Sequence, residues 1–153
     1  MDLPLYFEDL ALGMRFETAG ATLTEDAVIR FGLEWDFQPF HVDREAAADS
    51  IFGGLIASGL HTLVMSYRLF NQLGVTNGTA LAGLGMDRIR WHAPVHAGDT
   101  LRVGASVGSL RSSGSKSDRG VVVWHLETLN QRAERVFTAE LAALVKRRHE
   151  REA

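Results

Sequence analysis

The chain has 153 residues, a formal net charge of −3, 46% hydrophobic residues and 23% charged residues. These values suit one globular domain over residues 1–153 that forms an apolar core without covalent cross-links. The absence of cysteine excludes disulfides, a thiolate nucleophile and a zinc–thiolate site. The slight negative charge offers no positive field to attract nucleic acid.

The start of the chain and its hydropathy bear on location. Met1-Asp2-Leu3-Pro4 lacks the basic region and apolar run of a signal peptide. No uninterrupted apolar stretch reaches the roughly 18 residues of a membrane helix. We therefore expect a cytoplasmic protein that does not bind membranes.

The first part of the chain predicts one strand and then a helix. Apolar residues alternate loosely over residues 14–23, which indicates the strand. Thr24 can cap a helix whose first turn carries two acids, and this helix must end before Pro39. Its buried side is expected to consist of Ala27, Val28, Phe31 and Leu33.

A short helix and a long helix follow. Asp43 can cap a helix over Arg44–Ala48, residues 50–54 form a loop, and Ser58 can cap a long helix over residues 60–73. Gly74 is a natural stop. Apolar residues recur along the long helix near the helical period, so we expect it to be largely buried. The apolar positions are Leu60, Leu63, Val64, Met65, Tyr67, Leu69, Phe70 and Leu73.

The second half of the chain predicts strands. A glycine-rich, irregular stretch at 75–83 leads to a strand around 84–92, and further strands are expected at 100–110, 121–129 and 136–145. The connections are turns at 94–99 and 130–132 and an exposed, mobile segment at 111–120. The mostly basic residues at 146–153 are expected to form a mobile, solvated tail. Helices followed by a run of strands indicate an α+β domain, with an antiparallel sheet around the long helix.

The segment from Asp36 to His41 is the candidate for catalysis. A carboxylate and an imidazole lie five residues apart, and Pro39 between them prevents one smooth helix, so both side chains can converge on one point. Gly59 begins the long helix, where amides lack intrahelical partners and the helix dipole is positive. These groups suit acid–base chemistry with an oxyanion contact. A simple cap at Asp36, a structural histidine at His41 and an ordinary helix-start glycine are the alternatives.

Several motifs in this order resemble the MaoC-type acyl dehydratases, the family of (R)-specific enoyl-CoA hydratases. The central one is Asp36-Phe37-Gln38-Pro39-Phe40-His41-Val42-Asp43, which is similar to the family's Asp-x-Asn/Gln-Pro-x-His-x-Asp. The others are Phe7-Glu8-Asp9-Leu10, Thr24-Glu25-Asp26, Phe52-Gly53-Gly54-Leu55-Ile56-Ala57-Ser58-Gly59, Arg90-Trp91-His92-Ala93-Pro94-Val95-His96-Ala97-Gly98-Asp99 and Asn130-Gln131-Arg132. The resemblance covers almost the whole chain and implies a single hot-dog fold, a long helix wrapped by a curved antiparallel sheet of about five strands.

The resemblance also implies a reaction and the residues that perform it. Asp36 and His41 are expected to act through one water on a 2-enoyl or 3-hydroxyacyl thioester of CoA, in fatty acid metabolism. Gly59 is expected to contact the thioester oxygen. The substrate-binding residues that we expect are Gly54, Ser58, Ser66, Tyr67 and Arg90.

Some of these expectations depend on departures from the family pattern. Many members have His-Gly where this chain has Ser58-Gly59, and many have Gly-Asp where it has Trp35-Asp36. In some hydratases a serine of the long helix bonds the aspartate, and by spacing that position falls on Tyr67, with Ser66 beside it. Arg88 and Arg90 can meet CoA phosphates, with surface ion pairs as the alternative.

Two other functions and one other kind of site stay open. A hot-dog thioesterase commonly uses an acidic residue on the long helix, and here no acid lies between Asp49 and Asp87. A non-catalytic acyl-binding protein is the third possibility. A metal site of His41, Asp43 and His61 lacks regular ligand spacing, so we expect no metal and no cofactor beyond the CoA of the substrate. For His61 we expect ordinary packing or solvent exposure. Because a lone sheet leaves edge strands unpaired, and because the family forms dimers, we expect a homodimer or a larger homo-oligomer.

Overall fold

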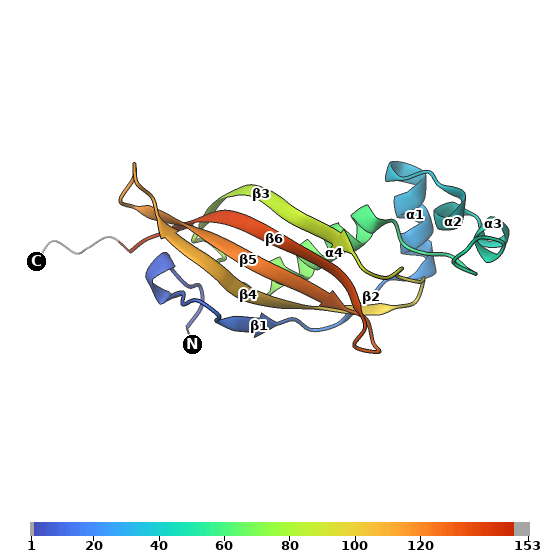
Figure 1. Ribbon diagram of the computed structural model, residues 1–153, viewed down its shortest axis with the longest axis horizontal. Helices are drawn as coiled ribbons and strands as arrows, with labels where there is room; N and C mark the ends of the chain where they lie inside the picture. Colours follow the sequence, from blue (N-terminus) through green and yellow to red (C-terminus); the bar gives the residue numbers. More distant parts are fainter. Residues whose placement is uncertain (1, 149–153) are drawn as a thin grey trace, which may run out of the picture.

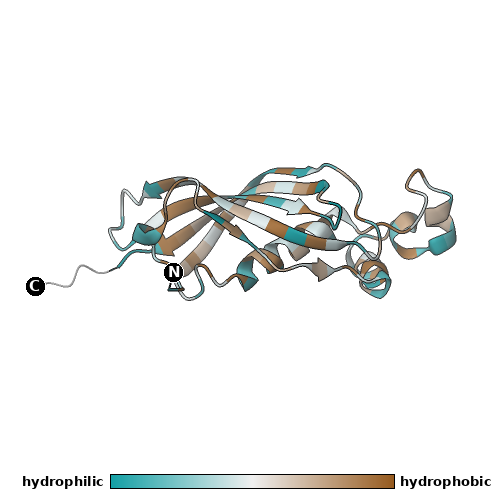
Figure 2. Cartoon of the chain, turned by 90° about the horizontal axis from the view of Figure 1, so that it is seen from below, coloured by the Kyte–Doolittle hydropathy of each residue, from teal (hydrophilic) through white to brown (hydrophobic). Residues whose placement is uncertain are grey.

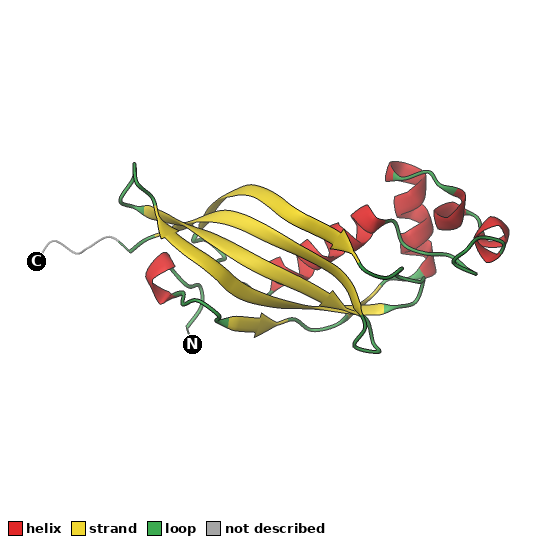
Figure 3. Cartoon of the chain, in the orientation of Figure 1, coloured by secondary structure: helices red, strands yellow, loops and turns green. Residues whose placement is uncertain are grey.

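A long helix lies against a curved antiparallel sheet in the computed structural model, which describes residues 2–148 (Figure 1). The elements in chain order are η1 (Phe7–Asp9), β1 (Arg15–Glu17), β2 (Ala21–Thr22), α1 (Glu25–Trp35), α2 (Pro39–Val42), α3 (Arg44–Ala48), α4 (Gly59–Gln72), β3 (Ala80–Trp91), β4 (Thr100–Ser112), β5 (Arg119–Leu129) and β6 (Arg135–Lys146). The small helices α1, α2 and α3 gather beyond one end of the sheet (Figure 3).

The sheet has six strands in the order β1-β4-β5-β6-β3, with β2 also pairing with β4, and every pairing is antiparallel. This architecture confirms the predicted hot-dog arrangement. The strand predicted at 14–23 is divided into β1 and β2. The interruption follows from Thr18, whose side-chain Oγ1 accepts the Val103 N–H at 2.9 Å in place of a backbone carbonyl.

The core lies between the sheet and one side of α4. Hydrophobic and hydrophilic residues alternate along the central strands, so one face of the sheet is apolar (Figure 2). Trp124 of β5, 1% exposed, packs against Phe70 of α4 with ring centroids 5.2 Å apart. This contact fixes the long helix across the middle of the sheet.

The predicted burial of α4 is wrong on one side of the helix. Leu60, Val64 and Tyr67 are 48%, 47% and 41% exposed. The buried face consists of His61, Thr62, Ser66, Leu69 and Phe70. A sheet covers only one side of a helix. Because apolar residues lie around most of the circumference of α4, its sequence does not show which side the sheet covers.

Two other expectations about exposure and boundaries are corrected. Leu33 on α1 is 56% exposed, whereas Val28 is fully buried as predicted. The strand expected around 84–92 begins earlier, at Ala80. Strands β4 and β5 extend into the predicted 111–120 connection and leave residues 113–118 between them.

The predicted tail is partly structured. Lys146 ends β6, and the next two residues form ion pairs with the N-terminal segment: Arg147 with Glu8 and Arg148 with Asp9, each at 2.6 Å. Residues 149–153 of the predicted tail lie outside the described residues. Across residues 2–148, no helix combines the length and hydrophobicity needed to cross a membrane.

Candidate active site

The helical block and the start of α4 meet at a pocket of about 460 Å³. Its wall comes from the α1–α2 segment, the loop before α4, the first turns of α4, and the end of β3 with the loop that follows. Most of the lining side chains are apolar. The lining residues are Asp36, Gln38, Phe40, His41, Phe52, Ile56, Ala57, Gly59, Leu60, Thr62, Trp91, His92, Ala93, Pro94 and Val95.

Asp36 is the C-cap of α1, and several donors hold its carboxylate. Ser58 Oγ donates to Oδ2 at 2.6 Å, and Gln38 Nε2 donates to Oδ1 at 2.8 Å. These hydrogen bonds, that from Ser58 first, lower the pKa of Asp36 below its ordinary value, and the charge of His41 acts in the same direction. The carboxylate is therefore ionised near neutral pH although it lines a largely apolar pocket.

His41 is 3% exposed and lies on α2, a single turn that has Pro39 at its start. Its Nδ1 is 2.7 Å from the carbonyl oxygen of Ile56. Because a carbonyl oxygen only accepts, we assign the proton of the neutral ring to Nδ1. The lone pair of Nε2 then faces Asp36 Oδ2 at 3.3 Å, so a proton arriving between these atoms finds two acceptors.

Ser58 and Gly59 place the start of α4 beside this pair. Ser58 is fully buried, and while its Oγ donates to Asp36 it also accepts the Leu60 N–H at 3.2 Å, which confirms it as the N-cap. Gly59 is the first residue of α4 and lines the pocket. Amides of a first helical turn have no intrahelical acceptor, so this end of the pocket favours negative charge.

Comparison with known proteins shows the family of this chain, because residues 9–128 match the MaoC like domain. The chain belongs to the MaoC-like dehydratase family. The uncharacterized protein YdeM of Bacillus subtilis is 33% identical over 140 residues, which cover 92% of this chain and 98% of YdeM. The 3-hydroxyacyl-thioester dehydratase Z of Mycobacterium tuberculosis is 34% identical over 103 residues, covering 66% of this chain and 68% of that protein. The crystal structure of the MaoC-like dehydratase from Rhodospirillum rubrum matches with a TM-score of 0.88 and 39% identity, covering 95% of this chain and 99% of that chain.

Of the predicted site residues of this MaoC-like protein, the structure brings together Asp36, His41, Ser58 and Gly59. It does not bring Ser66 or Tyr67 to the carboxylate. Ser66 Oγ donates to Thr62 O and shares a 2.7 Å hydrogen bond with Thr128, whereas Tyr67 lies on the exposed side of α4. The sequence left open whether Ser66, Tyr67 or neither supports Asp36, and in the structure the N-cap serine Ser58 bonds the carboxylate instead.

Gly54 and Arg90 also lie outside the pocket lining. Arg90 is exposed on β3, and its neighbour Arg88 pairs with Glu140 at 3.3 Å, which is the surface alternative stated for these arginines. Gln38 and Trp91 also line the pocket, although neither was predicted as a site residue from the sequence. Both residues lie inside motifs that resemble the family, and these motifs were the only indication of their position that the sequence contained.

His61 takes the packing role, one of the two expected of it. It is 7% exposed, and its ring stacks on Phe31 of α1 with centroids 4.5 Å apart. Its Nδ1 is buried and has no hydrogen-bond partner among residues 2–148. Burial, and secondarily the charge of His41, lower the pKa of His61, so the ring is neutral. Asp43 is turned elsewhere, since it caps α3 through the amides of Glu45 and Ala46.

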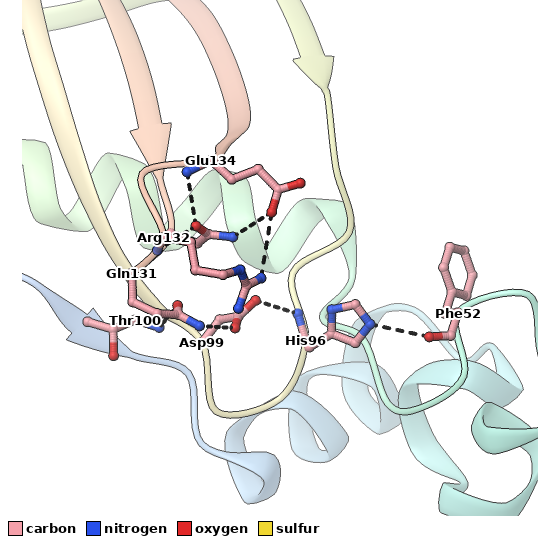
Figure 4. A network of polar contacts seen from close by, with 8 residues as sticks. Phe52, His96, Asp99, Thr100, Gln131, Arg132 and Glu134 are labelled. Atoms are coloured by element: carbon pink, nitrogen blue, oxygen red, sulfur yellow. Dashed lines mark hydrogen bonds and ion pairs between the residues drawn. The ribbon is translucent and has the colours of Figure 1, made fainter.

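A network of polar contacts connects the loops that form part of the pocket wall (Figure 4). Asp99, 5% exposed, accepts the His96 N–H at 2.9 Å and Gln131 Nε2 at 2.7 Å, and Gln131 in turn accepts the Thr100 N–H. His96 Nε2 reaches the carbonyl of Phe52 at 3.3 Å. The network thus ties the 130–134 turn to the loops that carry Val95 and Phe52, both of which line the pocket.

Replacement of Ser58 tests the link between α4 and the carboxylate. Because the Ser58 hydrogen bond is the largest cause of the lowered pKa, Ser58→Ala should raise the pKa of Asp36 towards its ordinary 3.8. Loss of the cap should also destabilise the fold by about 1 kcal/mol. Carbon-13 NMR titration of the Asp36 carboxyl measures the first effect, with Ser66→Ala as the matched buried-serine control. An unchanged Asp36 pKa in Ser58→Ala would contradict the assignment.

Replacement of His61 tests its neutrality. Because the folded-state pKa is lowered, the unfolded chain binds more protons as the pH falls below 6.5, and stability must drop there. This single group contributes at most about 1.4 kcal/mol per pH unit. His61→Phe, which keeps the stack on Phe31, should lessen the loss of denaturant stability between about pH 6.5 and 5. His92→Phe removes an exposed histidine and serves as the control. Identical pH profiles for wild type and His61→Phe would refute the prediction.

Proposed function

We propose that this protein is a hydro-lyase that adds or removes water across a 2-enoyl or 3-hydroxyacyl thioester of CoA. The observation that carries the proposal is the pair formed by Asp36 and His41 beside the N-terminus of α4. Asp36 is ionised, and its Oδ2 lies 3.3 Å from Nε2 of His41, whose neutral ring carries its proton on Nδ1. Family membership supports a hydration or dehydration reaction in general. The roles of the individual residues are our inference.

The pair is suited to activating one water. A water that donates hydrogen bonds to both His41 Nε2 and Asp36 Oδ2 loses a proton to Nε2 while its oxygen forms a bond to C3 of the enoyl group. The positive imidazolium that forms is stabilised by the adjacent Asp36 carboxylate. The Nδ1–H bond to Ile56 keeps the ring in the tautomer that this step needs.

The start of α4 is suited to stabilising the negative charge that develops during the reaction. As C3 is attacked, the π electrons move to the thioester oxygen, where the Gly59 N–H and the positive helix end stabilise the charge. The proton held by the pair then passes to C2, and the carbonyl re-forms. Dehydration follows the same steps in reverse. The chain supplies every proton transfer, so the proposed reaction needs no resident cofactor.

The pocket also constrains the acyl group. Its lining contains no lysine or arginine, and its only ionisable side chains are Asp36, His41 and His92. The proposed substrate therefore carries an uncharged, apolar acyl chain, because a carboxylate on that chain would be desolvated without a counter-charge.

Asp36→Asn is the direct test. It preserves shape and removes the negative charge, so the hydration rate of crotonyl-CoA should fall about 10²- to 10⁴-fold while circular dichroism is unchanged. Loss of the enoyl absorbance is measured with thiol release in parallel, and Asp49→Asn, an exposed acid at the end of α3, is the matched control.

The other functions give different results in this assay. Thiol release without hydration would indicate a thioesterase, against the absence of acids on α4. If wild type changes neither signal with short, long or branched acyl chains, an acyl-binding role replaces the proposed enzyme. An active Asp36→Asn variant would refute the residue assignment alone.

We further propose that the protein forms a homodimer through β3. This strand lies at the edge of the sheet and pairs only with β6 in the described chain. Leu81 and Leu84 of β3 are 39% and 54% exposed, and the exposed side of α4 adds Leu60, Val64 and Tyr67. Strand pairing with a second copy would cover both the open strand edge and this apolar surface.

Light scattering tests the dimer. We expect twice the chain mass of 16.8 kDa at micromolar concentration. Leu84→Asp together with Val64→Asp should yield monomers, because two charges would be buried in the interface. Ile51→Asp, at a loop position that is 96% exposed, should leave the mass unchanged. A monomeric wild type would overturn the proposal.

A further inference from the structure

Trp91, the last residue of β3, joins the sheet to the start of α4. Its indole Nε1–H donates to the carbonyl oxygen of Gly59 at 2.8 Å, across 32 residues of sequence. The side chain is 51% exposed and lines the pocket. The indole therefore forms part of the pocket wall, with its N–H turned to the helix.

The indole ring lies directly against Gly59. A Cβ atom at position 59 would come within 2.6 Å of Trp91 Cε2 and 2.7 Å of Nε1, which is closer than carbon and nitrogen atoms approach. Gly59 is not among the glycines with a positive φ angle, so its backbone conformation does not demand glycine. The requirement for glycine comes from the tryptophan.

The hydrogen bonds around this contact hold one peptide group at both of its ends. The carbonyl of Gly59 and the N–H of Leu60 belong to the same planar unit. Trp91 donates to the carbonyl, and Ser58 Oγ accepts the N–H at 3.2 Å. Fixing this unit fixes the Cα of Gly59 and thereby restricts the position of the preceding amide, which is the proposed oxyanion contact.

The same serine extends this series of hydrogen bonds to Asp36, the carboxylate of the proposed pair. Ser58 Oγ donates to Asp36 at 2.6 Å while it accepts from Leu60. Trp91 and Asp36 thus lie at opposite ends of one series of hydrogen bonds, through the Gly59–Leu60 peptide and Ser58. Without the indole, the carbonyl end of that peptide loses its only side-chain donor among residues 2–148 and keeps only its partner within the first turn of the helix.

We propose that Trp91 is a positioning residue that holds the Gly59 amide in line with the thioester oxygen. This inference rests on the proposed hydro-lyase reaction and adds to it a residue outside the Asp36–His41 pair. Trp91 acts through the backbone of α4 and transfers no proton. Its loss should therefore weaken stabilisation of the transition state while the acid–base groups stay intact.

Trp91→Phe separates the N–H from the ring. It keeps an aromatic wall in the pocket and removes the donor, so the kcat for crotonyl-CoA should fall about 10- to 100-fold with KM changed less than about threefold. The pH profile of kcat/KM should keep its shape, because Asp36 and His41 are untouched. Trp35→Phe, at an indole that is 71% exposed and lines no part of the pocket, should keep wild-type kinetics.

Gly59→Ala is a second test of the contact between Gly59 and Trp91. The added methyl group must displace the indole, which is half exposed and has room to turn away. Because both changes break the same contact, the double variant Gly59→Ala/Trp91→Phe should be no slower than the slower single variant. Fully additive losses would overturn the proposed coupling.

The remaining outcomes are distinguishable. An active wild type whose kcat is unchanged in Trp91→Phe would overturn the positioning role and leave the hydro-lyase proposal standing. A rise in KM with kcat unchanged would reduce Trp91 to a wall of the pocket and overturn the role as well. A wild-type protein without hydratase activity on any acyl-CoA would overturn both proposals together.

Discussion

The hydroxyl of Ser58 is the contact on which the site depends. It donates a hydrogen bond to Asp36 and accepts one from the N–H of Leu60, so one small side chain both orders the carboxylate and begins the long helix. A helix start is the one place in a helix with free amides. Because the Asp36 carboxylate lies beside this helix start, the proposed Asp36–His41 pair and the proposed oxyanion contact are within reach of one substrate.

The electrostatics of the pocket follow from hydrogen bonds more than from exposure. An ionised carboxylate in an apolar pocket is costly unless donors compensate for the lost water. Ser58 and Gln38 provide them for Asp36, and the carbonyl of Ile56 sets the tautomer of His41. A second imidazole, His61, is buried nearby and stacks on Phe31, and its burial lowers its pKa, so the ring is neutral.

The long helix illustrates the limit of periodicity. Its apolar residues predicted a buried helix, and the helix exists with the predicted cap and stop. Its covered face nevertheless carries Thr62 and Ser66, whereas Leu60 and Val64 are exposed. Small polar residues let the helix approach the sheet, where Ser66 bonds Thr128 across 62 residues of sequence. A pairing at that separation has no local signal.

The sequence by itself determined the helices α1, α3 and α4, the four long strands, the caps at Thr24, Asp43 and Ser58, the antiparallel α+β class and the family motif that contains Asp36 and His41. These depend on local geometry and on residue order, which the linear chain displays. The short elements η1 and α2 were not predicted, and β1 and β2 were predicted as one strand. The tertiary structure decided which hydroxyl serves the carboxylate: Ser58 meets Asp36 across 22 residues, and Ser66 does not. It also decided that Trp91 meets Gly59, because that contact exists only after β3 has been laid against the start of α4.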